Sequence, residues 1–494
     1  MKSKISLLFV FLVFFNCKEA HKSTQKKSED PIEYSMDTNA ELFLEIPEIN
    51  AISIGVYKDG KTYTGYYGEI DPGKNNPPSD NSIYELASVT KSFTGILVSQ
   101  AVLDAKITLD DDIRKYLDGD YTNLEYDNRP ILIKDLLTHS SGIRRDLSQP
   151  LTKIFASDAT PEDKEAIKNY DRNTLLKDLQ NYKLDTIPGA RYQYSPIVGP
   201  EIIALILEQV YNKSYSELLD IYILDKANMT NTKMTLDASG NQKIMNGYDE
   251  KGERVEPVFI PMTAAGGGLK TTIPDMVKYM TYLLESDNPV IKEMQKPLFF
   301  DTEDEDQYGY FWMLTEGFRH SGGTIGNTNW LIINPEINAG FTVMLNTNGG
   351  NSGDLLNGIA SRTLDDLENY PLKNFYFPVK SEVLKNTDSG IEFYKQLKKD
   401  KPKEFDFDNT RTLNRIGYDL LRDKKMKDAI KVFQLLVFEF PDEGNPYDSL
   451  GEAYFIDEQY DLSSVNYKKA LELNPNNNNA KAMLEELNKI MSQN

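Results

Sequence analysis

Two strand-turn-strand patterns that lie far apart in the chain constrain its fold more than any other feature. The first joins residues 51–57 and 62–67 through Asp59-Gly60, and the second joins residues 330–333 and 340–345 through Asn334-Pro335. Each predicts two neighbouring antiparallel strands, because such turn residues between apolar runs reverse the chain. Between the two patterns, apolar residues recur with helical spacing at 92–103, 133–137 and 199–211. We therefore expect an α/β (α+β) fold in which an antiparallel sheet, closed by both halves of the domain, is flanked by helices and a helical subdomain.

The last ninety residues carry an internal repeat with a period of 34 residues, at which nine positions match, among them Gly417 with Gly451. This pattern resembles tetratricopeptide repeats, in which small residues let two helices pack closely. Two repeats cannot bury a helical core alone, so we expect further helices at 390–399 and 480–490. The resemblance implies an all-α module that either binds a peptide of a protein partner or only packs beside the main domain as a spacer.

The beginning of the chain is typical of an export signal. A basic start is followed by an apolar run over 5–15 that is too short to span a membrane. Cys17, the only cysteine, comes directly after it and resembles the lipidated residue of a bacterial lipoprotein. We therefore expect attachment at the cell envelope through a lipid anchor alone; the alternative is an ordinary signal peptide with an incidental cysteine. The predicted divisions are a signal peptide 1–17, a flexible tether 18–37, a main domain 38–375, a linker and helix 376–404, and the repeats 405–494.

The composition and the missing motifs exclude several classes of function. The net charge of -21 disfavours nucleic acid as a partner. The chain has neither a Gly-x-Ser-x-Gly elbow nor a phosphate-binding P-loop. Its three histidines, His21, His139 and His320, form no zinc motif. We therefore expect no metal and no cofactor, and we interpret His139 as a buried structural residue near a helix end.

Ser88 and Lys91 stand at the head of an apolar helical run and are the best candidates for catalysis. A serine and a lysine three residues apart lie on one face of a helix. A buried lysine with a lowered pKa can take the proton of the serine hydroxyl and make it a nucleophile. The same spacing occurs at Ser23 and Lys26, but in a polar stretch without helical periodicity. Only the first pair is expected to be catalytic.

Such a pair needs an acid for the leaving group and donors for the oxygen that becomes negatively charged. Residues 188–196 form a turn-rich segment before an apolar helix and contain Tyr192 and Tyr194 as candidate acids. Residues 320–323, His-Ser-Gly-Gly, precede the second strand pair, and their glycines allow a substrate to approach the backbone.

Together these segments resemble the active-site motifs of the serine beta-lactamase and penicillin-binding-protein superfamily. The matching branch contains class C beta-lactamases, D-Ala-D-Ala carboxypeptidases and related esterases. The matching segments are Ser88 to Lys91, Tyr194-Ser195, His320 to Gly323, residues 135–143 and residues 264–269, which follow one another in the expected order.

The resemblance implies a role for each motif residue. Ser88 would form an acyl-enzyme, Lys91 would accept its proton, and Tyr194 would act as the shared acid and base. The backbone N–H groups of Ser88 and Gly323 would form the oxyanion hole. The substrate-binding residues would be His320, which stands where many relatives have lysine, together with Ser321 and Gly322.

One departure bears on the substrate. Beta-lactamases of this kind carry Tyr-x-Asn, but Pro196 occupies the place of the asparagine and has no side-chain donor. This argues against efficient beta-lactam hydrolysis and leaves a small ester or a D-amino-acid peptide of the cell wall as the expected substrate. A beta-lactamase or penicillin-binding protein is the alternative, and a non-catalytic binding or scaffold protein is the rival from another class.

Overall fold

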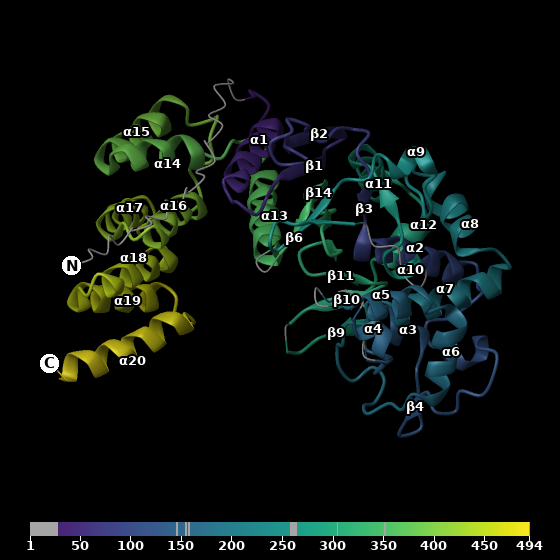
Figure 1. Ribbon diagram of the computed structural model, residues 1–494. Helices are drawn as coiled ribbons and strands as arrows, with labels where there is room; N and C mark the ends of the chain where they lie inside the picture. The colour runs from purple at the N-terminus through teal and green to yellow at the C-terminus, as the bar shows by residue number, and fades with distance from the viewer. Residues whose placement is uncertain are drawn as a thin grey trace, which may run out of the picture.

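The computed structural model describes residues 28–493, apart from gaps at 145–146, 154–155, 157–158, 257–263, 304 and 350–351. It shows a mixed α/β body with an arm of helices at one side (Figure 1). The predicted signal peptide 1–17 and Cys17 lie outside the described residues. Within the described part of the chain, no helix combines the length and the apolar character needed to cross a membrane.

An eight-stranded antiparallel sheet forms the centre of the body. Its strands run in the order β2 (Lys61–Gly68), β1 (Ala51–Lys58), β14 (Ala339–Leu345), β13 (Thr328–Asn334), β12 (Phe318–Gly323), β11 (Trp312–Met313), β10 (Gln307–Gly309) and β9 (Phe299–Phe300). Strand β1 pairs with β14 in a register that runs from Ile52 with Leu345 to Lys58 with Ala339. The two predicted strand pairs are therefore neighbours in one sheet, and the predicted α/β (α+β) fold is confirmed.

The chain between β2 and β9 supplies one helical layer and the helical subdomain. Its helical elements are η1 (Ala87–Val89), α2 (Thr90–Leu103), η2 (Ile113–Tyr116), α3 (Ile133–Leu137), α4 (Gln149–Thr152), α5 (Pro161–Lys168), α6 (Arg172–Asn181), α7 (Val198–Tyr211), α8 (Tyr215–Leu219), η3 (Asp220–Leu224), α9 (Ala238–Asn241), α10 (Ala264–Gly267), α11 (Ile273–Glu285) and α12 (Pro289–Met294). The short strands are β3 (Tyr84–Glu85) with β8 (Lys270–Thr271), β4 (Glu125–Tyr126) with β5 (Arg129–Pro130), and β6 (Gly247–Asp249) between β7 (Arg254–Val255) and β15 (Thr347–Asn348).

Two apolar cores lie on opposite faces of the sheet. Successive residues of a strand point to alternate faces, so neighbours in β13 and β14 join different cores. Leu331 and Met344 pack in the larger core with α2, α7 and α11. Ile332 and Val343 pack in a second core with α1 (Pro31–Leu44) and α13 (Ser352–Glu368). The body therefore has three layers, with the sheet between two groups of helices.

Helix α1 corrects part of the predicted tether 18–37, whose C-terminal end is helical. Asp30 caps the helix by accepting backbone N–H groups, and Pro31 occupies the first turn. Polar residues such as Ser35 and Asn39 are buried in this helix. The apolar stripe by which an amphipathic helix is recognised is therefore weak in the sequence.

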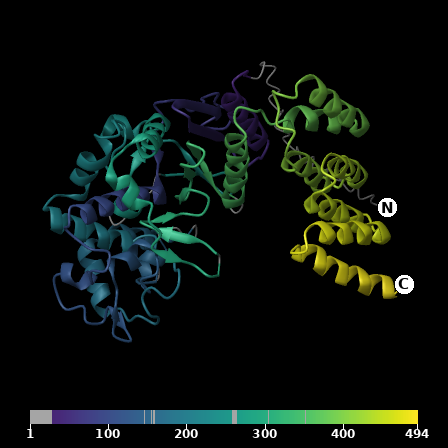
Figure 2. The same ribbon diagram turned by 180° about the vertical axis from the view of Figure 1, so that it is seen from behind.

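The arm consists of helix pairs that follow one another along the chain (Figures 1 and 2). Its helices are α14 (Tyr376–Lys385), α15 (Thr387–Asp400), α16 (Arg411–Arg422), α17 (Met426–Glu439), α18 (Gly444–Ile456), α19 (Tyr460–Leu473) and α20 (Asn478–Gln493). The further helices expected at 390–399 and 480–490 are confirmed as parts of α15 and α20. Helices α14 and α15 share an apolar core with α16 and α17, so the predicted linker segment 376–404 is a packed helix pair.

The pairs α16–α17 and α18–α19 repeat one another in local geometry. Lys424 and Glu458 occupy the same turn and both adopt left-handed conformations, with φ of 60° and 58°. Gly417 and Gly451 both face an aromatic ring of the following helix, and a Cβ atom there would lie 2.4 Å and 3.1 Å from that ring. Glycine at this position lets the two helices of a pair approach closely.

Helices α1 and α13 lie where the body meets the arm (Figure 1). The ring of Tyr34 in α1 packs edge-on against Phe405, with 6.5 Å between centroids. Arg411 and Arg415 of α16 donate to Asp365 of α13 at 2.9 and 3.0 Å. The arm is thus attached through an apolar contact and charged hydrogen bonds.

Candidate active site

Ser88 lies in the helical turn η1, which leads into α2. Ala87, directly before it, has a left-handed φ of 47°, a conformation that costs an L-residue roughly 1–3 kcal/mol. Ser88 is half-buried, whereas Ala87 and Val89 are buried. The turn therefore presents one hydroxyl group at the edge of a packed core.

Lys91 follows one turn later and has an exposed fraction of 0%. Its Nζ atom lies 3.0 Å from Ser88 Oγ and donates a hydrogen bond to the Gly266 carbonyl oxygen at 2.7 Å. Burial lowers the pKa of Lys91, because the charged form loses its hydration, while Tyr194 and Glu201 act in the opposite direction. A lowered pKa makes the neutral amine, the form that can accept a proton, more available.

Tyr194 approaches the same hydroxyl from the segment before α7. Its phenolic O–H donates to Ser88 Oγ at 2.8 Å. Lys91 Nζ lies 5.3 Å from the centroid of the Tyr194 ring. The structure thus brings together Ser88, Lys91 and Tyr194, the three residues predicted to be catalytic. The other candidate acid, Tyr192, stacks on Tyr308 with 4.3 Å between ring centroids.

Strand β12 runs past the turn η1, which holds Ser88, and carries residues 320–323. A Cβ atom on Gly322 would lie 2.6 Å from the Leu86 carbonyl oxygen, so only glycine allows this close approach. Asn329 of β13 donates to the same carbonyl at 3.3 Å and joins the strand to the turn. Gly323, the predicted oxyanion-hole residue, follows at the end of β12, and the side chain of Ser321 is exposed.

His320 is half-buried on β12. Its Nδ1 atom lies 2.7 Å from the Ser321 carbonyl oxygen. Since a carbonyl oxygen only accepts, the ring proton is on Nδ1 and Nε2 keeps its lone pair. Burial, with the nearby charge of Lys91, lowers the pKa of His320 to about 3. The imidazole is therefore neutral near pH 7 and offers a hydrogen-bond acceptor rather than a positive charge.

Glu201 is a buried carboxyl group that the sequence motifs do not include. It lies on α7 with an exposed fraction of 1%, and its Oε1 accepts the backbone N–H of Ala265 at 2.8 Å. It therefore holds the turn whose next carbonyl, that of Gly266, receives the hydrogen bond of Lys91. Burial raises the pKa of Glu201 to about 7. The available signal was an acidic residue directly before the apolar run 202–207 of this helix.

His139 is the second buried titratable residue beside the site. Its ring centroid lies 4.6 Å from that of Tyr194, and its Nδ1 accepts the backbone N–H of Ser195 at 3.2 Å. Burial, together with Lys91 and His320, lowers the pKa of His139 well below its ordinary value. The structure thus places this residue, interpreted from sequence as structural, directly behind a predicted catalytic side chain.

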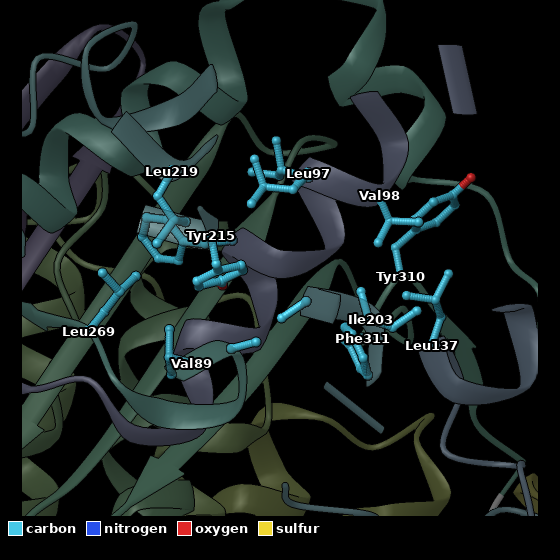
Figure 3. Close-up of a cluster of buried hydrophobic side chains, with 14 of the residues drawn as sticks. Val89, Leu97, Val98, Leu137, Ile203, Tyr215, Leu219, Leu269, Tyr310 and Phe311 are labelled. Carbon is cyan, nitrogen blue, oxygen red and sulfur yellow. The ribbon is translucent and has the colours of Figure 1, made fainter. Parts of the chain in front are cut away.

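Apolar side chains of η1 and α2 belong to a buried hydrophobic cluster, as Figure 3 shows for Val89, Leu97 and Val98. All three are at most 1% exposed. Tyr310 and Phe311 close the same core from the segment before β11. Such packing excludes water from the lysine side chain and sustains its lowered pKa.

This arrangement provides a nucleophile, a base and an acid without any further group. Within the residues that the structure describes, no three potential metal ligands lie together. The chemistry that the side chains support is acyl transfer to a serine, in which Lys91 and Tyr194 move protons and the β12 backbone faces the substrate carbonyl.

Comparison with protein families gives a match to the Beta-lactamase family over residues 39–362. Among curated proteins, the chain is 26% identical over 325 residues to Protein flp of Staphylococcus aureus (strain MRSA252), a match that covers 63% of this chain and 62% of that protein. A Beta-lactamase of Psychrobacter immobilis is 26% identical over 257 residues, which is 51% of this chain and 58% of that protein. The chain thus spans about three-fifths of the length of these relatives.

Among solved structures, a beta-lactamase/D-alanine carboxypeptidase from Yersinia pestis, complexed with citrate, shares the fold of the body. The TM-score is 0.57 at 23% identity, and the match covers 67% of this chain and 97% of that chain. At this identity the similarity establishes the fold.

Proposed function

The chain belongs to the beta-lactamase family, within the superfamily of transpeptidase-like serine hydrolases, and we propose that it is an exported enzyme that transfers the acyl group of an ester or amide to Ser88. One observation carries this proposal. Ser88 Oγ lies within hydrogen-bond distance of both the buried Lys91 Nζ, at 3.0 Å, and the Tyr194 hydroxyl, at 2.8 Å. A serine without a catalytic role would not require both a buried amine and a phenol at its hydroxyl group.

In the acylation step, neutral Lys91 takes the proton of Ser88 while Oγ attacks the substrate carbonyl carbon. The carbonyl oxygen becomes negatively charged and is stabilised by the N–H groups of Ser88 and Gly323. Tyr194 then donates its proton to the leaving alcohol or amine and recovers one from the Lys91 ammonium. The leaving group departs neutral, and the acyl-enzyme remains with Lys91 and Tyr194 in their starting states.

Hydrolysis of the acyl-enzyme reverses these proton transfers with water in place of the leaving group. Tyr194 accepts a proton from the attacking water as Lys91 accepts that of the phenol. When the tetrahedral intermediate collapses, Ser88 Oγ leaves and is protonated from Lys91. The products are a carboxylic acid and the free enzyme.

A small ester fits the substrate side of the site better than a beta-lactam, and a D-amino-acid peptide is the second candidate. Pro196 provides no side-chain donor for an acyl-amide group, and its carbonyl oxygen packs against Gly266, where a Cβ atom would approach it to 2.7 Å. His320, neutral with Nε2 as an acceptor, suits a substrate N–H or O–H group better than a carboxylate. We therefore expect that a terminal carboxylate on the substrate contributes little to binding.

Location and partners are further parts of the proposal. The signal-like start of the chain and Cys17 support attachment at the cell envelope, on its periplasmic or surface side, through a lipid anchor, and the repeats resemble tetratricopeptide modules that bind peptides. Neither is required for the chemistry at Ser88. The hydrolase proposal is therefore tested separately from them.

The decisive experiment is labelling of the purified protein with a fluorophosphonate and with a fluorescent penicillin. Wild type should be labelled and Ser88→Ala should not, because the hydroxyl that Lys91 Nζ and Tyr194 approach is that of Ser88. Ser23→Ala is the matched control, since Ser23 belongs to the other Ser-x-x-Lys, and it should label like wild type. Rapid turnover of a simple ester would favour an esterase, and a stable penicillin adduct a carboxypeptidase.

Failure of wild type both to label and to turn over any ester or D-amino-acid peptide would contradict the proposal. The non-catalytic binding protein would then be the better interpretation. Labelling that persists in Ser88→Ala would show that another residue reacts.

A further inference from the structure

His139 adopts a left-handed backbone conformation at the end of a helix. It follows the C-terminal end of α3 with a φ of 53°, the left-handed region in which glycine and asparagine are favoured. The Ser140 N–H donates to the Asp135 carbonyl oxygen at 2.8 Å and closes the helix end. Either of the favoured residues would end the helix equally well. The backbone conformation alone therefore does not require an imidazole at this position.

The residue is bonded to both neighbours of Tyr194. Its carbonyl oxygen accepts the Gln193 N–H at 2.6 Å, and its Nδ1 accepts the Ser195 N–H at 3.2 Å. The backbone on either side of Tyr194 is thus fixed to one residue. A displacement of the Tyr194 backbone would break at least one of these bonds.

The His139 ring is itself held in place. It lies 5.3 Å from the ring of Phe311 and 5.9 Å from that of Tyr192, measured between centroids. The Phe311 N–H donates to the Leu137 carbonyl oxygen at 2.8 Å, which joins this wall to the end of α3. The imidazole cannot turn without displacing these rings.

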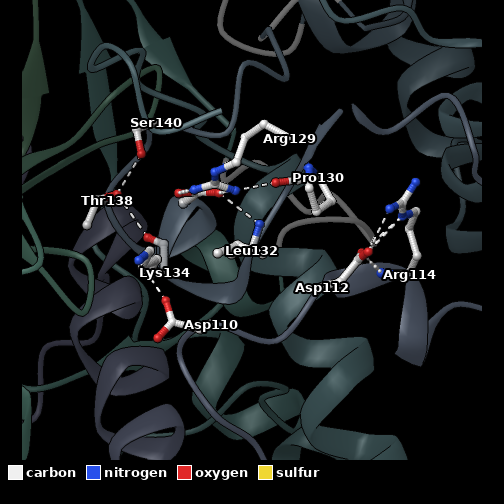
Figure 4. Close-up of polar contacts among 10 residues, drawn as sticks. Asp110, Asp112, Arg114, Arg129, Pro130, Leu132, Lys134, Thr138 and Ser140 are labelled. Atoms are coloured by element: carbon white, nitrogen blue, oxygen red, sulfur yellow. Dashed lines mark hydrogen bonds and ion pairs between the residues drawn. The ribbon is translucent and has the colours of Figure 1, made fainter. Parts of the chain in front are cut away.

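Helix α3 in turn is anchored at its other end. Arg129 donates to both carboxylate oxygens of Asp135, at 3.0 and 3.1 Å, and the Leu132 N–H donates to the same side chain at 2.8 Å. Figure 4 shows this network around Arg129 and Leu132, with the hydroxyl contact of Thr138 and Ser140 beside it. The support of Tyr194 therefore extends through His139 into a fixed helix.

The protonation state is consistent with this contact. Nδ1 accepts a hydrogen bond only when it carries a lone pair, so the imidazole must be neutral with its proton on Nε2. The charged or titratable groups near the ring are Lys91, His320, Tyr192 and Tyr194, and the first two disfavour a positive imidazole.

We propose that His139 is a positioning residue that places the Tyr194 hydroxyl against Ser88 by accepting the Ser195 N–H and packing on the Tyr194 ring. The inference rests on the proposed hydrolase function, because it assigns a task within that reaction. It gives His139 no contact with the substrate. Its loss should therefore lower kcat through Tyr194 and leave KM nearly unchanged.

Two substitutions of His139 separate the effect of its hydrogen-bond acceptor from that of its left-handed backbone conformation. Asparagine and glycine both tolerate the left-handed conformation, but only asparagine has an oxygen near the place of Nδ1. For ester hydrolysis, His139→Asn should stay within about fivefold of wild type, and His139→Gly should lose about 10- to 100-fold in kcat. Asn212→Gly is the matched control, because Asn212 ends α7 with a φ of 51°; it should behave like wild type.

The path of the effect is tested by combining His139→Gly with Tyr194→Phe. If His139 acts through the Tyr194 hydroxyl, His139→Gly should lower kcat by less than about threefold in the Tyr194→Phe variant, which lacks that hydroxyl. Equal losses with and without the hydroxyl would overturn the proposal, as would equal activities of His139→Asn and His139→Gly. Fluorophosphonate labelling of wild type that depends on Ser88 must be seen first, so failure of the hydrolase function is recognised separately.

Discussion

The candidate catalytic centre and the helical arm differ in how far apart in the sequence their contacting residues lie. The centre joins Ser88, Tyr194, Gly266 and His320, which come from distant parts of the chain. In the arm, each helix packs mainly on the one that precedes or follows it, as α16 does on α17 and α18 on α19. Changes in the arm should therefore remain local, whereas changes in the centre should act on several elements at once.

The two regions also differ in what they bury. The centre buries a lysine, a glutamate and a histidine, each of which loses hydration. The arm buries mainly aliphatic and aromatic side chains between its helices. We infer that the centre carries the larger cost in stability, because the buried carboxylates of the arm, Asp419 and Asp448, are hydrogen-bonded by Lys380 and by asparagine side chains.

The largest expected effect comes from Lys91→Met, which tests this cost directly. Loss of the base should reduce kcat for ester hydrolysis by about 10²- to 10⁴-fold. The melting temperature should stay the same or rise, because a buried amine is replaced by an apolar side chain of similar length. Turnover and thermal unfolding measured on one preparation check both parts. A kcat within tenfold of wild type would remove Lys91 as the base.

The second prediction concerns the matched glycines of the arm. A Cβ atom on Gly417 would lie 2.4 Å from Phe433, but one on Gly451 would lie 3.1 Å from Tyr467. Gly417→Ala should therefore destabilise the arm by about 2 kcal/mol, and Gly451→Ala by less than about 1 kcal/mol. Calorimetric unfolding measures the difference, while ester turnover should be the same in both variants. Loss of activity in either would show that the two regions are coupled.

Glu201→Gln is expected to shift the pH dependence of the centre. The negative charge of Glu201 raises the pKa of Lys91, so its removal should move the acid limb of the kcat/KM profile to lower pH. The folded state raises the pKa of Glu201 from 4.5 to about 7. The resulting stability is present below pH 4.5 and is lost as pH rises through 7.

Above pH 7, the Gln variant should therefore gain stability relative to wild type. Arg172, Glu208 and Tyr215 are the other titratable groups coupled to Glu201, and they are unchanged in this variant. Thermal unfolding at pH 5 and pH 8 measures the gain. An acid limb that is the same in both proteins would contradict an effect of Glu201 on the pKa of Lys91. A stability difference that is the same at pH 5 and pH 8 would contradict the raised pKa of Glu201.

The smallest effect is expected from deletion of residues 444–494, which removes α18, α19 and α20. The helices that remain keep the core shared by α14 to α17, although Leu450, Ala453 and Tyr454 are lost from it. Since Ser88 and its neighbours lie in another core, kcat/KM should stay within about twofold of wild type. A lower unfolding temperature of the arm alone would agree with local packing.

The sequence predicted the parts of the site that depend on short spacing. Ser88 and Lys91 are one helical turn apart, and the strands beside the two turns were recognisable from local patterns. Tyr194 and His320 were reached through motif resemblance, because no local rule relates them to Ser88. Their meeting depends on how α7 and β12 pack, which is a property of the whole fold.

The features that the sequence did not predict are those in which polar residues are buried. Residues 31–37, the first half of α1, were predicted as part of the tether because polar residues such as the buried Ser35 hide the apolar pattern, although Asp30-Pro31 is a typical helix start. Glu201 was not singled out for the same reason, whereas His139 was expected to be buried but its contacts with the Tyr194 segment were not predicted. Whether such a residue is solvated or enclosed is decided by distant segments, which local periodicity does not reveal.

The pairing of β1 with β14 affects the order in which the body can fold. Strand β1 can pair with β14 only after Leu345, the partner of Ile52, has been synthesised. Closing so long a loop is slow. Ser88 is synthesised early, but β12, which completes its surroundings, arrives late. A chain that leaves the ribosome from its N-terminus therefore lacks a complete candidate site until β12 has emerged, whereas each helix pair of the arm can form as soon as it emerges.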